Sequence, residues 1–154
     1  MRGGSIVVAG AIGALHLLGS VAGSAADDDG HAAFAHRADT MKRMGRALYT
    51  TIGRVVRGKA ELDQQAIDAA GTIADLAPTI GSLFPPGSNV GDSRIKPEIF
   101  DAAPRVSQLV SGVQAAAAGL VAAAKGGDKN ALAAAYKAQD EACEACHRDF
   151  RKPE

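Results

Sequence analysis

Apolar residues recur at steps of three and four along most of the chain, and no segment shows the strict alternation of a half-buried strand. The clearest segment spans residues 31–57 and is followed by Gly58, a residue type that commonly ends helices. Its apolar seam consists of Phe34, Ala38, Met41, Gly45, Leu48, Ile52 and Val55. Alternating four- and three-residue spacing is typical of a bundle helix, so we predict a long first helix here.

The same spacing predicts a second helix over residues 63–81, with Asp63 as its N-terminal cap. Its inward residues are Ala66, Ala69, Ile73, Leu76 and Ile80. A connection rich in proline and glycine, residues 84–97, then interrupts regular structure. Loops of this length in a compact domain are often functional.

A third helix is predicted to begin between Pro97 and Pro104, because proline fits only the first turn, and to end at Gly126 and Gly127. Asp128 caps a fourth helix that continues to about residue 151. The fourth helix carries on one side Leu132, Ala135, Gln139, Cys143, Cys146 and Phe150. These elements predict an all-α fold, an antiparallel up-and-down four-helix bundle.

The first residues have the pattern of a secretory signal peptide. Arg2 precedes an apolar run over residues 5–21, small residues follow, and Asp27 begins an acidic stretch. We therefore predict a cleaved signal peptide over residues 1–26 and a single mature domain over residues 27–154. A membrane anchor is the alternative, but the run lies at the lower limit for spanning a bilayer. No later stretch is expected to be apolar enough to cross a membrane.

The charge of the mature chain is nearly balanced. Removal of residues 1–26 takes one arginine from 17 basic and 17 acidic residues, which leaves 16 against 17. Binding to nucleic acid requires a clustered positive face, and the sequence shows none, so no nucleic-acid partner is expected. A core of side chains alone would be thin, since only 4% of the residues are aromatic and tryptophan is absent.

The run Cys143-Glu144-Ala145-Cys146-His147 is a C-x-x-C-H motif, the pattern of covalent c-type haem attachment. On a helix, both thiols and the histidine share one face, so Cys143 and Cys146 can reach the two haem vinyl groups while His147 binds iron. Export agrees with this prediction, because haem is attached outside the bacterial cytoplasm. The second ring nitrogen of His147 is expected to donate a hydrogen bond to a carbonyl or water.

Three other interpretations of the motif compete with haem attachment. A thioredoxin-like redox pair lies at the start of a helix after a strand, whereas this motif lies deep in the last helix. A zinc site needs further ligands, for which His31 or His36 is the available source. A disulfide between positions i and i+3 of one helix would be strained. Export, the helical pattern and the following histidine together favour haem.

With these residues in place, the mature chain resembles the class II c-type cytochromes, which include cytochrome c′. The resemblance rests on C-x-x-C-H followed by Phe150-Arg151, on Arg37 four residues before Met41, and on the segment at 96–100, KPEIF. Such proteins commonly have tryptophan where this chain has Phe100. The resemblance implies a soluble periplasmic protein with one covalently bound haem c, which transfers electrons to redox partner proteins and converts no substrate.

In this family, the residue matching Met41 covers the iron face opposite His147. If Met41 binds iron as second axial ligand, the centre is six-coordinate and low-spin, as suits electron transfer. Met41-Lys42-x-x-Gly45 resembles the methionine-ligated members, and Gly45 would let a haem approach closely. If Met41 only packs over the iron, the protein is a five-coordinate cytochrome c′ that binds nitric oxide or carbon monoxide. Met44 is the poorer candidate ligand because it is rotated off the seam.

The resemblance also assigns other pocket residues. Arg37 would pair with a haem propionate, with an exposed position on a solvated face as the alternative. Arg151 resembles a proximal-pocket arginine, with a favourable charge at a helix end as the alternative, and Phe150 would pack beside the haem. Class II cytochromes often form homodimers through their first two helices. A basic docking face is the weaker interpretation of Lys125, Lys129, Arg148, Arg151 and Lys152, beside plain solvated surface.

Overall fold

The structure is a computed structural model, and it describes residues 22–153. Residues 1–21 of the predicted signal peptide lie outside the described residues, so cleavage stays a prediction. The first described element, α1, is a 24-residue helix over Ala22–Gly45. It continues as η1 (Arg46–Ile52), a turn and a half of π-helix, and α2 (Gly53–Val56). Gly58, with φ of 67°, ends this long helical stretch as predicted.

The predicted second helix is confirmed as an α-helix over its first part and continues as a 3₁₀ helix. Helix α3 covers Gln64–Leu76, and the Asp63 carboxylate accepts a hydrogen bond from the Ala66 N–H, as expected for a cap. From Ala77 the chain forms a 3₁₀ helix, η2 (Ala77–Leu83), with Pro78 in its first turn. Proline lacks an N–H donor and crowds the preceding turn, which explains why the α-helix stops before residue 81.

The last two helices follow the prediction closely. A short 3₁₀ helix, η3 (Pro97–Asp101), precedes α4 (Ala103–Gly126), which ends at Gly127 with φ of 74°. Helix α5 spans Lys129–Phe150, and the Asp128 carboxylate accepts hydrogen bonds from the N–H groups of Asn130 and Ala131.

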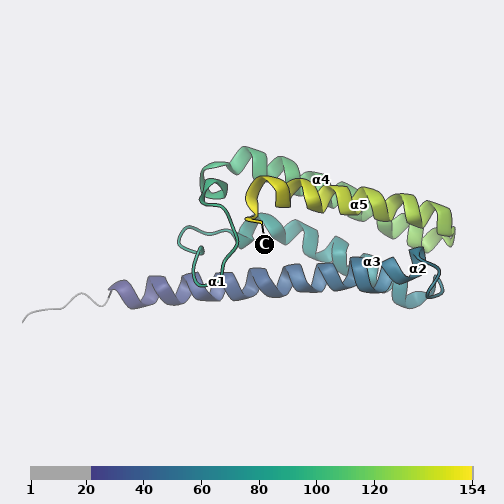
Figure 1. Ribbon diagram of the computed structural model, residues 1–154, viewed down its shortest axis with the longest axis horizontal. Helices are drawn as coiled ribbons and strands as arrows, with labels where there is room; N and C mark the ends of the chain where they lie inside the picture. The colour runs from purple at the N-terminus through teal and green to yellow at the C-terminus, as the bar shows by residue number, and fades with distance from the viewer. Residues whose placement is uncertain (1–21, 154) are drawn as a thin grey trace, which may run out of the picture.

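The helices form a four-helix bundle, which confirms the predicted all-α class. The α1–η1–α2 stretch runs along one side and the α4–α5 pair along the other (Figure 1). Helix α3 packs against η1 and α4, and α2 contacts α5. The described residues contain no strand, only an isolated antiparallel bridge between Ile95 and Arg151. The core includes Leu48, Ile52, Ile73, Leu120 and Leu132.

Helix α4 corrects one expectation. By length and composition alone it is apolar enough to cross a membrane, contrary to the prediction that no stretch after the N-terminus would be. Its inward residues, Val106, Leu109, Val110, Val113, Ala117, Leu120 and Ala124, are buried. This face packs against α3 and α5, so the apolar character of α4 serves the bundle core.

The loop between η2 and η3 lies directly on α1. A Cβ atom at Gly30 would stand 2.6 Å from the carbonyl oxygen of Gly87, so the two backbones touch here. Gly87 itself has φ of 82°, a conformation that glycine adopts without strain. The loop thereby closes one end of the space between α1 and the α4–α5 pair.

Candidate functional site

A cavity of about 470 Å³ opens between α1 and α5, and the remaining walls come from η1, α3, η2, η3, α4 and the η2–η3 loop. Sites for small molecules and cofactors span roughly 300–1,000 Å³. Aliphatic and aromatic side chains form most of the wall, including Phe34, Leu48, Ile73, Ile80, Phe84, Ile99, Leu109, Val110, Val113 and Phe150. The apolar lining and the size suit a large, flat, hydrophobic cofactor.

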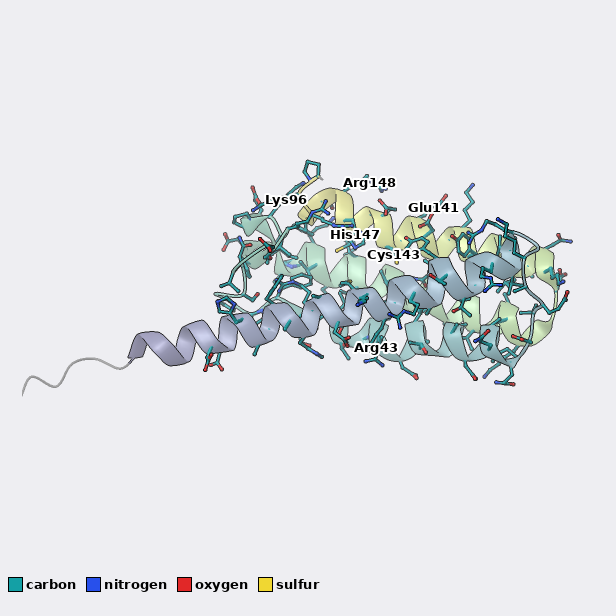
Figure 2. All side chains as sticks on the ribbon, turned by 60° about the horizontal axis from the view of Figure 1, so that its bottom comes forward. Arg43, Lys96, Glu141, Cys143, His147 and Arg148 are labelled. Atoms are coloured by element: carbon teal, nitrogen blue, oxygen red, sulfur yellow. The ribbon has the colours of Figure 1, made fainter. Side chains whose placement is uncertain are left out.

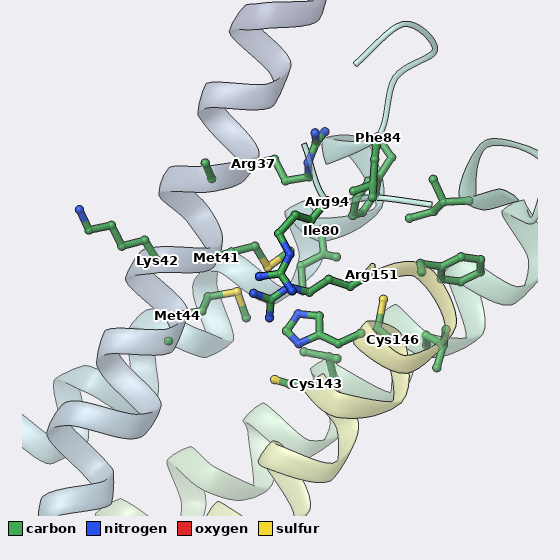
Figure 3. A pocket seen from close by; sticks show the side chains of 18 of the residues that line it. Arg37, Met41, Lys42, Met44, Ile80, Phe84, Arg94, Cys143, Cys146 and Arg151 are labelled. Atoms are coloured by element: carbon green, nitrogen blue, oxygen red, sulfur yellow. The ribbon is translucent and has the colours of Figure 1, made fainter. Parts of the chain in front are cut away.

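Helix α5 presents the whole C-x-x-C-H motif to this cavity. Cys143, Cys146 and His147 all line it, as the helical spacing predicts (Figure 3). Cys143 and His147 lie on the side of α5 toward α1, whereas Glu141 and Arg148 extend from its outer side (Figure 2). Both cysteines are free, so the structure does not form the disulfide of the alternative interpretation.

The remaining alternatives for the motif also find no support. Within residues 22–153, no group of three histidine, cysteine, aspartate or glutamate side chains is placed to hold a metal ion. His31 and His36, the candidate extra zinc ligands, are exposed on α1. The motif stands near the C-terminal end of α5, far from the helix start at which thioredoxin-like pairs occur.

Burial sets the protonation states in the cavity wall. Burial raises the pKa of Cys143 and of Cys146, and nearby carboxylates, Asp140 and Asp149 respectively, add to this effect. Burial lowers the pKa of His147, and the positive charge of Arg151 lowers it further. The imidazole therefore favours its neutral form, which is the form that binds metals.

Two buried polar atoms in the cavity wall have no hydrogen-bond partner. One is Nδ1 of His147, for which we predicted a carbonyl or water acceptor. The Glu144 carboxylate lies 3.8 Å from this nitrogen, which is too long for a hydrogen bond. The other is Oε1 of Gln139, a fully buried side chain whose Nε2 donates to Cys143 Sγ at 3.4 Å. The sequence pattern placed Gln139 on the inward side but gave no hint of its polar contact.

The opposite wall carries two methionines. Met41 and Met44 both line the cavity from α1, and their side chains point toward the α5 wall (Figure 3). Met44 is only 6% exposed and belongs to the core, while Met41 is half-buried. The prediction that Met44 would be rotated away was therefore wrong. A Cβ atom at Gly45 would meet only the Tyr49 ring, at 3.9 Å, so packing within the chain does not itself require glycine there.

Arg37 is buried, which contradicts the alternative of a solvated face. Its guanidinium donates to the Leu83 carbonyl and the Ser88 hydroxyl through one nitrogen, and to the Ser88 carbonyl and the Ser93 hydroxyl through the other. It also lies over the rings of Phe34 and Phe84, 5.8 Å and 5.5 Å from their centroids. Arg37 lines the cavity, yet four of its five N–H donors serve the loop.

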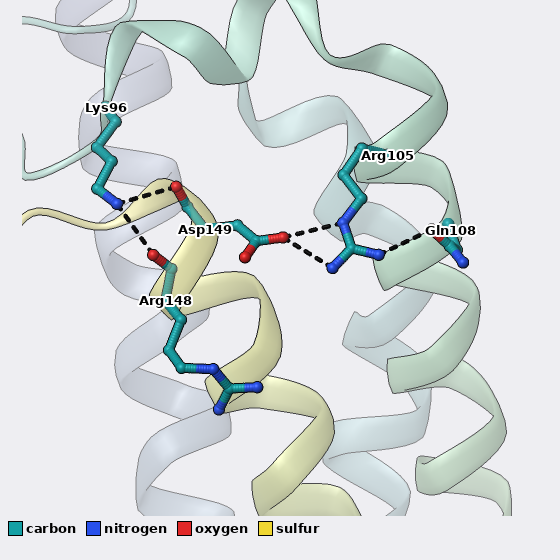
Figure 4. Close-up of polar contacts among 5 residues, drawn as sticks. All are labelled: Lys96, Arg105, Gln108, Arg148 and Asp149. Atoms are coloured by element: carbon teal, nitrogen blue, oxygen red, sulfur yellow. Dashed lines mark hydrogen bonds and ion pairs between the residues drawn. The ribbon is translucent and has the colours of Figure 1, made fainter.

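The C-terminal end of α5 is held in place by the η2–η3 loop and by α4. Lys96 Nζ donates to the carbonyls of Arg148 and Asp149, at 2.9 Å and 3.0 Å (Figure 4). Arg105 binds the Asp149 carboxylate through two nitrogens, at 2.9 Å and 2.8 Å. These contacts fix the backbone that carries His147, and the Arg151 N–H donates to the His147 carbonyl at 2.8 Å.

Two of the predicted pocket residues, Phe150 and Arg151, lie at this end of the cavity. Phe150 is buried and lines the cavity, and Arg151 lines it from an exposed position. Arg94, which the sequence did not single out, joins Arg151 in the same wall (Figure 3). Its position depends on the pairing of residues 94–96 with the C-terminal segment, because Lys152 N–H donates to the Arg94 carbonyl. That long-range pairing has no local sequence signal.

The basic docking face does not form as one surface. Lys125 and Lys129 flank the α4–α5 turn, and Lys129 pairs there with Glu61 at 2.9 Å. Arg148 lies at the other end of α5, roughly 28 Å away at the helical rise of about 1.5 Å per residue. The proposed set is therefore split between the two ends of the bundle.

A helical bundle with C-x-x-C-H in the wall of an apolar cavity defines a class, the c-type cytochromes. The family profile for Cytochrome C′ matches residues 32–151. The cytochrome c′ of Rhodocyclus tenuis is 33% identical over 107 residues, which cover 62% of this chain and 80% of the relative. The chain therefore belongs to the cytochrome c′ family, whose members bind one covalently attached haem c.

Solved structures agree with this assignment. The cytochrome c′ of Thermochromatium tepidum aligns with a TM-score of 0.74 and 30% identity, over 80% of this chain and 97% of that one. A ferrous variant of the cytochrome c′ of Alcaligenes xylosoxidans with bound NO aligns with a TM-score of 0.71 and 28% identity, over 79% and 94% of the two chains.

Proposed function

We propose that Cys143 and Cys146 hold the haem through thioethers and that His147 is its proximal iron ligand. The observation that carries this proposal is the convergence of both thiols and the imidazole on one wall of the apolar cavity. The bound haem would supply the Fe(II)/Fe(III) couple. The chain supplies the ligand, excludes water with its apolar walls, and fixes α5 through Lys96 and Arg105.

Electron transfer is the function that we propose for this centre, with Met41 as second axial ligand. Met41 stands in the cavity wall opposite α5, and a thioether ligand raises the reduction potential and keeps the iron low-spin. The protein then passes electrons between redox partner proteins and converts no substrate. We also propose a periplasmic location, on the basis of the N-terminal signal pattern.

Gas binding is the second candidate function. A similar protein, the Alcaligenes xylosoxidans variant, has been solved with NO bound. This chain belongs to the same family and has an apolar cavity beside its C-x-x-C-H motif. In this alternative Met41 packs over a five-coordinate iron without binding it. The homodimer implied by the family resemblance stays a prediction in either case.

Absorption spectra of the reduced protein, before and after addition of carbon monoxide, distinguish the two functions. If Met41 binds iron, we expect sharp low-spin bands that carbon monoxide leaves unchanged in the wild type. Met41→Ala should give a high-spin spectrum that shifts with carbon monoxide. Met44→Ala is the matched control, because Met44 lines the same cavity from the next turn of α1.

The control variant also reports on the ligand assignment. Loss of the low-spin bands in Met44→Ala but not in Met41→Ala would move the ligand to Met44. A broad high-spin spectrum that responds to carbon monoxide in all three proteins would contradict methionine ligation and favour gas binding.

A further inference from the structure

The proximal histidine leaves one polar atom without a partner. His147 Nδ1 is buried, and the folded chain offers it no hydrogen bond. A buried N–H without a partner destabilises the folded protein, so such an atom needs an explanation. When one ring nitrogen of a neutral imidazole binds iron, the other carries the proton and requires an acceptor.

Glu144 is placed to supply that acceptor. Its carboxylate lies three residues before His147 on α5, and Oε1 stands 3.8 Å from Nδ1. The Glu144 side chain is 51% exposed, so it is free to change rotamer. Closing the remaining gap of roughly 1 Å to a normal N–H···O distance needs only such a change. The opposing neighbour, Arg151, is a cation and cannot accept a hydrogen bond.

We propose that Glu144 is the positioning residue of the proximal ligand: its carboxylate accepts the hydrogen bond from His147 Nδ1–H and leaves Nε2 for the iron. This inference rests on the proposed ligation by His147. A carboxylate acceptor fixes the tautomer and the plane of the ring and makes the imidazole a stronger donor to the metal. A stronger donor stabilises ferric over ferrous iron, so Glu144 lowers the reduction potential of the haem.

The position of Glu144 within the motif supports this role. In C-x-x-C-H the two middle positions are not constrained by haem attachment, and here the first of them is an acid. Positions i and i+3 of a helix are neighbours, so an acid at this position lies beside the histidine. Glu141, one turn earlier, extends from the outer side of α5 and pairs with Lys137 at 3.7 Å (Figure 2). It is the matched control, with the same charge on the same helix.

The test compares the haem-loaded wild type with Glu144→Gln, Glu144→Ala and Glu141→Gln. One readout is the reduction potential. The other is the ¹⁵N and proton NMR shift of His147 Nδ1–H, recorded in the reduced low-spin protein or, if the iron is five-coordinate, in its carbon monoxide adduct. We expect the potential to rise in Glu144→Gln and further in Glu144→Ala, and the Nδ1–H signal to move in both. Glu141→Gln should match the wild type in both readouts.

Two results would overturn the inference. An unchanged reduction potential and an unchanged Nδ1–H shift in both Glu144 variants would exclude the hydrogen bond. An equal rise of the potential in Glu141→Gln would show that the effect comes from the net charge of the protein and not from a hydrogen bond to His147. If Glu144→Ala fails to fold or to retain haem, Glu144→Gln, which keeps size and polarity, decides alone. Failure of the proposed ligation by His147 gives a different result. In that case the wild-type protein itself lacks the spectrum of a histidine-ligated haem, before any variant is compared.

Discussion

Arg37 fastens the η2–η3 loop to α1. The sequence placed an arginine one turn before Met41 but left its surroundings open, because helical periodicity does not show which loop will fold over a given face. In the structure the last residue of η2 and the loop after it bring the Leu83 and Ser88 carbonyls to the guanidinium. The positive charge is buried among hydrogen-bond acceptors and aromatic rings, so its main role is to hold the cavity wall.

Replacement of Arg37 by methionine should destabilise the protein by about 2–4 kcal/mol, because buried carbonyls lose a charged donor. Unfolding of the haem-loaded protein by denaturant measures this change. Arg43→Met is the control, since Arg43 lies on the same helix, is 55% exposed and makes only a 3.8 Å surface pair with Asp39. Equal stability of the two variants would show that the loop does not depend on Arg37.

Tyr49 makes stability depend on alkaline pH. Partial burial of the Tyr49 side chain, which is 41% exposed, followed by the 2.7 Å hydrogen bond to Asp140, raises the pKa of Tyr49 above its usual value of 10.0. The folded protein thus holds the phenolic proton more tightly than the unfolded chain. The stabilisation is complete below the unfolded pKa and is lost as pH rises above it.

We expect the melting temperature of the wild type to fall between about pH 9 and 11 relative to that of Tyr49→Phe, so that the stability advantage of the wild type shrinks. Thermal unfolding across this range measures the effect. Tyr136→Phe, which changes the other tyrosine of the chain, should keep the wild-type profile. A constant difference between wild type and Tyr49→Phe at every pH would contradict the assignment.

At the level of elements, helix ends that carry a capping residue or a left-handed glycine were predictable, whereas the end of α3 and the helix types were not. Asp63 and Asp128 mark N-termini and Gly58 and Gly127 mark C-termini, because capping and left-handed glycine conformations are local. The π-helical stretch η1 and the 3₁₀ stretch η2 were not predicted. Pro78 offered a local signal for η2, whereas η1, which packs against α3 and α5, consists of ordinary helix-compatible residues and carries no such signal.

The C-terminal end of α5 depends on Lys96. Its ammonium group caps the Arg148 and Asp149 carbonyls, which would otherwise lack partners at the helix end. Lys96→Met should therefore reduce protection of the Arg151 and Lys152 amides and cost about 1 kcal/mol of stability. Hydrogen exchange measured by NMR tests this.

Lys137→Met is the control for that experiment, because Lys137 is on α5, is 78% exposed and lies far from the C-terminal end of that helix. Protection of the two amides should be unaffected in this variant. Unaltered exchange in Lys96→Met would mean that backbone pairing with residues 94–96 alone secures the segment.

For the whole molecule, the sequence predicted the bundle and the residues of one cavity wall, because α5 carries the entire C-x-x-C-H motif within one helix. It could not predict contributions that depend on how separate elements meet. Met44 borders the cavity beside Met41, so two adjacent stripes of α1 face inward. Arg94 lines the cavity because its segment pairs with the C-terminal residues. Lys125 and Lys129 lie at the opposite end of α5 from the C-x-x-C-H motif.

Peptide mass spectrometry of protein matured with haem-attachment machinery tests the central claim most directly. The account predicts one haem on the peptide that contains Cys143 and Cys146, with neither thiol open to alkylation. Cys143→Ala and Cys146→Ala should each leave at most one thioether. Recovery of that peptide from the folded wild-type protein with two alkylated thiols and no haem would contradict the account.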